Sequence, residues 1–252
     1  MNTSLWAIAA LGFVLGMRHA TDPDHVVAVT TIVARQHSTR RAAAIGAMWG
    51  VGHTLTILLV GGGIILFQWV IPTRLGLSME FSVALMLIFL GILNLRDMKS
   101  WLASLRAKGT AAEAHAHGPH DHQHGDEPGL LFLDQHLGRA PIYQLVRPLL
   151  IGIVHGLAGS AAVALLVLAT IHDPRWGMLY LLVFGLGTVV GMMLITSVIA
   201  VPFAVAGKRR ASLHRTLRLA SGAISLLFGL YVAWRIGIVG GLFTSHPSWT
   251  PS

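Results

Sequence analysis

The chain has 252 residues, of which 54% are hydrophobic and only 11% are charged. A soluble domain carries about 25% charged residues, so the composition excludes an ordinary soluble domain and favours a protein embedded in a membrane. The sequence has no cysteine, which excludes disulfides and thiolate metal sites and leaves nitrogen and oxygen atoms, or a methionine, as metal ligands. The formal net charge of +8 comes from basic residues between apolar stretches, a signal of membrane topology rather than of nucleic-acid binding.

Six apolar stretches are candidates for membrane helices, since a hydrocarbon core about 30 Å thick requires about 20 helical residues. They cover residues 5–33, 42–70, 81–95, 146–171, 177–206 and 217–234. We do not expect the first to be a signal peptide, because no basic residue precedes it and no small-residue cleavage site follows. The sequence therefore predicts an all-α integral membrane protein with six transmembrane helices.

The first stretch contains a group of ionisable residues, His19, Asp22, Asp24 and His25. An Asp near the centre of a membrane helix costs about 2.5–3.5 kcal/mol, so such a cluster indicates a functional site. Imidazoles and carboxylates suit Ni²⁺, Co²⁺, Zn²⁺, Mn²⁺ or Fe²⁺ and do not choose among them. The alternative is a structural ion pair of Arg18 with one of the carboxylates.

Pro23 lies inside this group and has no N–H to donate to the carbonyl of His19, so the helix is expected to break or kink there. In an unbroken helix His19 and His25 would point about 120° apart and could not bind one ion. On this interpretation, alanine at position 23 would restore regular helix and lower the metal affinity at least about tenfold.

The second stretch contains His53 beside Gly50, Gly52 and Thr54. Small residues let another helix approach closely. We therefore expect His53 to lie beside the first stretch and to contribute a metal ligand. The alternative is a histidine that is hydrogen-bonded across a helix interface.

The hydrophilic segment between the third and fourth stretches, residues 99–143, has the composition of a disordered, cytoplasmic linker. Five of the fourteen histidines fall within ten residues of it, which suits loose capture of divalent metal. These are His115, His117, His120, His122 and His124. The alternative is a neutral, solvated linker.

The second half of the chain repeats features of the first. The matched pairs are Gly16 and Gly152, His19 and His155, Gly52 and Gly187, and Gly91 and Gly229, at offsets of 135 to 138 positions. Because each unit has three helices, the second copy would run in the opposite direction, as a 3+3 inverted repeat with its substrate site near the midplane. The expected units are residues 1–98 and 144–240, joined by the linker and followed by a short tail, 241–252. On this repeat, His155, Ser160 and Thr188 are candidate pathway residues, and His155 is a candidate ligand, proton relay or packing residue.

Basic residues favour one side of the membrane. Fourteen lie within or beside the first, third and fifth loops, against Arg74, Arg175 and Arg235 on the other side. By the positive-inside rule, the odd loops are cytoplasmic and both termini lie outside.

Two motifs indicate a family. Arg18-His19-Ala-Thr-Asp22-Pro23-Asp24-His25 resembles the H-x4-D-H signature of the nickel/cobalt permeases, and Trp49-Gly-Val-Gly52-His53-Thr54 is similar to their second segment. The resemblance implies that His19, Asp24 and His25 are the core metal ligands, with Asp22 and His53 as close supports. Independently of the resemblance, we expect Arg18 to neutralise a carboxylate and Thr54 to lie in the pathway or beside the site.

One segment departs from the main family. Where that family has Asp-Thr-Ala-Thr-Glu, this chain has His155-Gly-Leu-Ala-Gly159-Ser160, without an acid. The pattern resembles the shorter urease-accessory transmembrane branch of the superfamily. This resemblance implies cytoplasmic nickel-handling or urease-maturation proteins as partners.

We therefore expect a secondary transporter in the cell membrane that carries Ni²⁺ or Co²⁺ inward and has no cofactor. A negative-inside potential favours cation entry by ~2.3 kcal/mol per charge per 100 mV, and the chain has neither a P-loop nor the His-Glu-x-x-His motif of a metallohydrolase. The alternatives are a metal exporter with the His-rich loop as a collecting arm, a carrier of Zn²⁺, Mn²⁺ or Fe²⁺, and a transporter of organic substrates.

Overall fold

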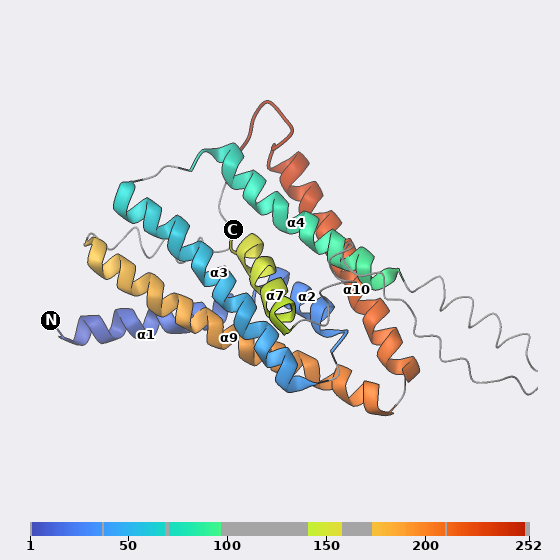
Figure 1. Cartoon of the computed structure of the whole chain (residues 1–252). Helices are drawn as coiled ribbons and strands as arrows, with labels where there is room; N and C mark the ends of the chain where they lie inside the picture. The colour runs from blue at the N-terminus through green and yellow to red at the C-terminus, as the bar shows by residue number, and fades with distance from the viewer. Residues whose placement is uncertain are drawn as a thin grey trace, which may run out of the picture.

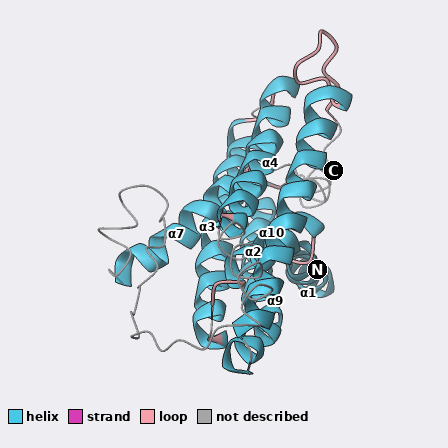
Figure 2. Cartoon of the chain, turned by 90° about the vertical axis from the view of Figure 1, so that its right-hand side faces the viewer, coloured by secondary structure: helices cyan, strands magenta, loops and turns pink. Residues whose placement is uncertain are grey.

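The computed structural model describes residues 2–36, 38–68, 71–96, 141–157, 173–209 and 211–249, whose regular structure is entirely helical (Figures 1 and 2). The helices are α1 (Asn2–His19), α2 (Pro23–Val33), α3 (Thr39–Phe67), α4 (Thr73–Leu95), α7 (Pro141–Gly156), α9 (Pro174–Arg209) and α10 (Ala211–Trp234), and a π-helical turn (Arg235–Val239) follows α10. Within the described ranges, four helices are long and apolar enough to cross a membrane: α3, α4, α9 to Ala206, and the helical segment from Ser212 to Val239. Shorter apolar helices are α2 and the second part of α7. The predicted all-helical membrane class is confirmed.

Proline marks several helix starts. Pro23, Pro141 and Pro174 are the first residues of α2, α7 and α9, and Pro72 immediately precedes α4. A proline at the first helical position loses no hydrogen bond, because that N–H has no partner within the helix, and its fixed φ suits the helix. These residues therefore set where the chain leaves one helix and enters the next.

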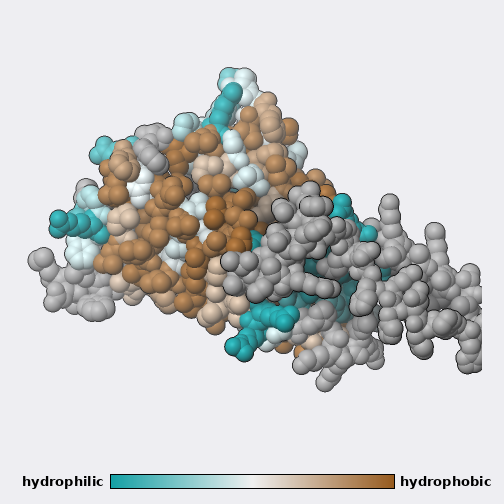
Figure 3. All heavy atoms as spheres, in the orientation of Figure 1, coloured by the Kyte–Doolittle hydropathy of each residue, from teal (hydrophilic) through white to brown (hydrophobic). Residues whose placement is uncertain are grey.

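The outer surface is apolar over a broad region. Leu59 on α3, Leu186 and Val198 on α9, and Leu227 on α10 are each 62–69% exposed. Figure 3 shows this hydrophobic region between hydrophilic patches at its ends. Contiguous exposed apolar surface of this extent fits contact with lipid rather than with water.

The structure corrects several predicted bounds. The first apolar stretch begins at Asn2 and is divided by the predicted break into α1 and α2, with the break lying between His19 and Pro23. α4 begins at Thr73 and not at residue 81, because polar residues of its first turns lower the local hydropathy without preventing helix formation. α9 and α10 also extend beyond the predicted stretches, and of the fourth stretch only the part before residue 158 is described.

α1 and α9 approach each other through glycine. A Cβ atom at Gly16 would lie 2.1 Å from the carbonyl oxygen of Phe184, and one at Gly187 would lie 2.2 Å from the carbonyl oxygen of Phe13. Such distances leave room only for a hydrogen atom, so the two backbones touch directly.

α3 and α7 make the same pair of contacts. A Cβ at Gly152 would lie 2.1 Å from the carbonyl oxygen of Trp49, and one at Gly52 would lie 2.2 Å from that of Leu149. Each contact of the α1–α9 pair thus has a counterpart here, with the residue numbers shifted by 135 or 136.

α4 and α10 form a third pair. A Cβ at Gly91 would lie 2.8 Å from the carbonyl oxygen of Gly222, and one at Gly229 would lie 3.0 Å from that of Ala84. The two contacts correspond to each other at an offset of 138 positions.

The end of α2 is fixed to the end of α4. The Asn94 side chain donates to the carbonyl of Thr31 at 2.8 Å and accepts from Arg35 Nε at 2.8 Å, while Arg35 also donates to the Leu93 carbonyl. Together with a shared core cluster around Val29, these bonds hold α2 alongside α4.

Candidate metal centre

The ionisable residues of the first stretch lie at the break between α1 and α2. α1 ends at His19, and the N–H of Asp22 donates to the His19 carbonyl at 3.1 Å. Asp22 has an extended conformation (φ −60°, ψ 146°), as expected for a residue that precedes proline. The chain therefore turns within three residues and begins α2 at Pro23. The predicted break is present at the predicted place.

Four histidines from four helices meet at this break: His19 of α1, His25 of α2, His53 of α3 and His155 of α7. Each is at most 5% exposed. The ring centroid of His25 lies 4.7 Å from that of His19, 5.0 Å from that of His53 and 4.2 Å from that of His155. The Nε2 atoms of His19 and His53 lie 2.8 Å apart.

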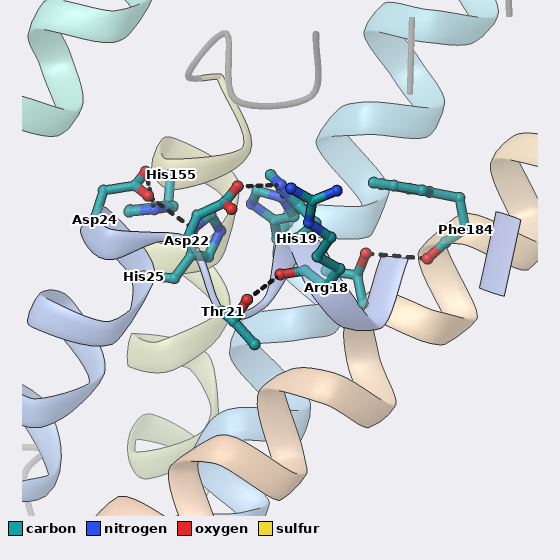
Figure 4. A network of polar contacts seen from close by, with 10 residues as sticks. Arg18, His19, Thr21, Asp22, Asp24, His25, His155 and Phe184 are labelled. Atoms are coloured by element: carbon teal, nitrogen blue, oxygen red, sulfur yellow. Dashed lines mark hydrogen bonds and ion pairs between the residues drawn. The ribbon is translucent and has the colours of Figure 1, made fainter. Parts of the chain in front are cut away.

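Two carboxylates contact these rings (Figure 4). Nδ1 of His19 donates to Asp22 at 2.8 Å, and the two oxygens of Asp24 accept from His25 Nδ1 at 3.1 Å and from His155 Nε2 at 3.0 Å. A carboxylate accepts hydrogen bonds only, so it selects the ring tautomer that has a proton on the bonded nitrogen. In the neutral rings, the opposite nitrogen of each imidazole then carries a lone pair.

These unprotonated ring nitrogens indicate a cation-binding site. Nε2 of His19 accepts from His53 Nε2, because His19 carries its proton on Nδ1. Nε2 of His25, Nδ1 of His53 and Nδ1 of His155 are buried and have no hydrogen-bond partner among the described residues. Buried polar atoms are normally satisfied, and an unprotonated imidazole nitrogen is a common metal ligand.

Two groups of potential ligands overlap at the centre. One consists of His19, His25 and His53, and the other of Asp24, His25 and His155. Within each group, one ligand atom from each residue lies within 4.8 Å of the others. His25 belongs to both groups, so the cluster is one continuous site.

Aromatic side chains form a wall of the cluster that the sequence did not predict. The Trp49 ring stacks on His25, with centroids 6.0 Å apart and planes at 15°, and meets His155 edge-on at 5.3 Å. Phe184 lies 5.6 Å from His19. Trp49 and Phe184 are 135 positions apart, so the repeat offset was a signal that could have found the pair.

Other predicted residues lie elsewhere or outside the described chain. Arg18 is exposed, and within the described residues Asp22 and Asp24 pair with histidines instead of with Arg18. Thr54 donates to the Gly185 carbonyl of α9, and Thr188 to a carbonyl of its own helix. Ser160 and the five linker histidines, His115, His117, His120, His122 and His124, lie outside the described residues.

The structure revises the expected effect of Pro23→Ala. Pro23 is the first residue of α2, where its missing N–H costs nothing, and α2 packs against α4 and α10 as well as against α9, the main partner of α1. Alanine at this position is therefore not enough to join the two helices. We expect the free energy of unfolding to change by less than about 1 kcal/mol and the metal affinity by less than about tenfold. Metal titration and thermal unfolding of parent and variant test this, and a larger loss of affinity at unchanged stability would restore the interpretation from sequence.

Comparison with known proteins agrees with the two motifs. The sequence model of the NicO family, described as "High-affinity nickel-transport protein", matches residues 5–242. A relative named "Urease accessory protein UreH", from Bacillus sp. (strain TB-90), is 37% identical over 242 residues, which are 96% of this chain and 97% of that protein. No solved structure matches the chain. The resemblance to nickel permeases is thus confirmed, and the family is one of transporters rather than of enzymes. This transmembrane protein belongs to the NicO family of high-affinity nickel-transport proteins.

Proposed function

We propose that the protein is a secondary transporter that carries a divalent transition-metal ion, Ni²⁺ or Co²⁺ first, across the cell membrane into the cytoplasm. The observation that carries the proposal is the junction of four buried histidines and two partly buried carboxylates at the helix break. Ionisable groups are costly within apolar helices and are usually retained there for function. A divalent ion opposite Asp22 and Asp24 with neutral imidazoles leaves the loaded site close to neutral, which lowers the cost of holding the ion in the membrane.

We assign His19, His25 and His53 as the nitrogen ligands. Imidazole nitrogens bind transition metals at about 2.0–2.1 Å, so two of them at right angles around an ion lie about 3.0 Å apart. The Nε2 atoms of His19 and His53 lie 2.8 Å apart, close to that spacing. An ion could therefore lie between them with little movement of either ring, once the proton of His53 moves from Nε2 to Nδ1.

Asp22 and Asp24 contribute to the site by accepting hydrogen bonds from the ring nitrogens that do not bind the ion. Metal-ligating histidines usually donate their other N–H to a carboxylate or carbonyl, which fixes the ring and its tautomer. His19 and His25 do so with Asp22 and Asp24 respectively. Asp24 also accepts from His155, and we assign His155 to the pathway of the ion next to the three nitrogen ligands.

We propose that the helices form a 3+3 inverted repeat of residues 1–98 and 144–240, with the linker 99–143 between them and the tail 241–252 after them. The equivalent glycine contacts on three helix pairs support this. Such repeats alternate access to one site by rocking against each other.

The distribution of Lys and Arg supports a topology with both termini outside and the His-rich loop in the cytoplasm, where its histidines would capture metal loosely.

Export is the alternative direction of transport, and one specific observation favours it. A histidine-rich tract on the cytoplasmic side would also serve an exporter as a collecting arm. An N/O ligand set likewise accommodates Zn²⁺, Mn²⁺ or Fe²⁺. The name of the relative, a urease accessory protein, favours Ni²⁺ and inward transport, with delivery to cytoplasmic nickel-handling or urease-maturation proteins.

Metal uptake by cells and metal binding by the purified protein test the proposal together. Cells that express the parent protein are expected to accumulate Ni²⁺ or Co²⁺, and the purified protein is expected to bind the same ion. His25→Ala removes the residue shared by both ligand groups and should abolish both properties. Asp173→Asn, at an exposed ionisable residue outside the cluster, is the control and should retain them. A fall in cellular metal on expression would indicate export, and normal uptake by the His25 variant would overturn the site.

A further inference from the structure

The residues after α10 fold back over the start of α4. We call residues 240–249 the C-terminal strap, and Figure 1 shows it as the loop that connects the end of the π-helical turn to the region of α4. The strap closes on itself through the Ser248 N–H, which donates to the Gly240 carbonyl at 3.0 Å, and Gly241 provides the turn with φ at +78°. Phe243 packs edge-on against Phe81 of α4, with centroids 5.3 Å apart. The strap is thus a defined structure held against α4.

Trp249 attaches the end of the strap to α4. A Cβ at Gly76 would lie 2.6 Å from the Trp249 ring, so the ring lies directly on the helix backbone. One turn further along α4, the Glu80 carboxylate accepts a hydrogen bond from Trp249 Nε1 at 2.8 Å. A glycine and an acid on one face of α4 therefore receive the ring and the N–H of the same indole.

Glu80 is an unusual residue for its position. The described residues contain four carboxylates, Asp22, Asp24, Glu80 and Asp173, and of these only Glu80 lies within a helix long enough to cross a membrane. Glu80 is half-buried, and it shares the packed face of α4 with Val83 and Leu87. No ion pair joins it to a basic residue within the described part of the chain. An ionisable group in an apolar helix without such a pair indicates function.

Glu80 lies between the strap and the metal centre. Asn94 of α4 is bonded to Thr31 of α2, seven residues after Asp24. Counted back along both helices, Glu80 is about seven residues, or roughly 10 Å, beyond the level of Asp24 in the direction of the strap. Two carboxylates at this separation would both be stabilised by a divalent cation that passes between them.

We infer that Glu80 is an outer binding site for the divalent metal ion on its way to the histidine cluster. Trp249 acts as a latch, because its hydrogen bond competes with the ion for this carboxylate. The inference rests on the proposed transport function and on the strap lying at the outer side. A carboxylate oxygen is a ligand for hydrated divalent cations, and the indole N–H occupies one oxygen in the closed arrangement. Release of Trp249 exposes the carboxylate, and the ion then moves toward Asp24.

Uptake kinetics separate the charge of Glu80 from its hydrogen bond. Glu80→Gln keeps an oxygen that accepts from Trp249 but removes the charge, and it is expected to raise the half-saturating Ni²⁺ concentration about tenfold with little change in maximal rate. Trp249→Phe keeps a ring over Gly76 but removes the N–H, and it is expected to lower that concentration about fivefold. In the double variant the effect of Trp249→Phe should vanish, because the two act on one group. Trp234→Phe, at an exposed tryptophan of α10, is the control.

A labelling experiment tests the latch without metal. The chain has no cysteine, so Leu77→Cys places a single thiol under the strap, where Leu77 is 3% exposed and lies against Gly240. A membrane-impermeant maleimide added from outside should react slowly with this protein and faster when Trp249→Phe is added. Equal labelling, together with an unchanged half-saturating concentration in Glu80→Gln, would overturn the inference while transport stands. Absence of uptake and metal binding in the parent would instead overturn the proposed function. The kinetic measurement does not depend on the cysteine variant and decides the matter if that variant fails to fold.

Discussion

Replacement of Asp24 by asparagine is expected to abolish metal transport while the protein still folds and inserts. The two oxygens of Asp24 accept from His25 and His155, and asparagine offers one oxygen and one NH₂ group. The NH₂ group would face a ring N–H, so one histidine would have to change its tautomer and lose the lone pair on its other nitrogen. The site also loses one of two negative charges. Loss of such an orienting carboxylate typically costs 10- to 100-fold in metal affinity, and uptake should fall at least as far. Metal titration and uptake at matched expression measure the effect.

Asp173→Asn is the control for this substitution. Asp173 precedes α9 and accepts from the Arg175 N–H at 2.9 Å at an exposed position. Its loss should cost about 1 kcal/mol of stability at most and leave transport intact. Normal uptake by Asp24→Asn would show that the carboxylate does not hold the two histidines in their working state.

Alanine at Gly152 is expected to destabilise the protein by about 3 kcal/mol or more, at the upper end of the range for overpacked sites. Its Cβ would lie 2.1 Å from the Trp49 carbonyl oxygen and 2.7 Å from the Trp49 ring. The carbonyl belongs to the backbone of α3 and cannot rotate away, so α7 would have to move as a body. Thermal unfolding in detergent, or the yield of monodisperse protein, measures the loss. If the proposed repeat is correct, Gly16→Ala should have an effect of similar size.

Gly62→Ala provides the matched control within α3. A Cβ at Gly62 would meet only the end of the Met178 side chain at 3.6 Å, an ordinary contact. Alanine is favoured over glycine in a helix by up to about 1 kcal/mol, so this variant should be as stable as the parent or slightly more so. Equal stability of Gly152→Ala and Gly62→Ala would mean that the helix pairs are not in direct backbone contact.

Composition and two motifs were enough to predict the class of the protein and its family, because apolar content and the H-x4-D-H spacing are local properties of the sequence. The break near Pro23 was predictable for the same reason. The start of α4 was not, since Arg74, Ser78 and Glu80 lower the hydropathy of its first turns. The strap satisfies two of them through contacts with residues about 170 positions away, at Thr244 and Trp249.

The centre itself was predictable only in part. The glycines beside His53 indicated a close helix approach, and His53 does lie against His19. That Asp24 bonds His155, 131 positions away, depends on how α2 and α7 pack and has no local signal. Among the described residues both acids pair with histidines, while Arg18, the partner expected from the sequence, is exposed.

The helix break has a further electrostatic consequence through the backbone. α1 ends at His19 and α7 ends at Gly156, beside His155, so the carboxyl-terminal ends of two helices meet at the histidines. Each carboxyl-terminal end carries the equivalent of about −0.5 elementary charge, whereas the amino-terminal end of α2, at Asp24, carries a partial positive charge. Peptide dipoles thus attract a positive charge to the imidazoles and favour the ionised state of the acid opposite them. The backbone dipoles thus supply part of the attraction for any cation, and the imidazole nitrogens provide the discrimination between one metal and another.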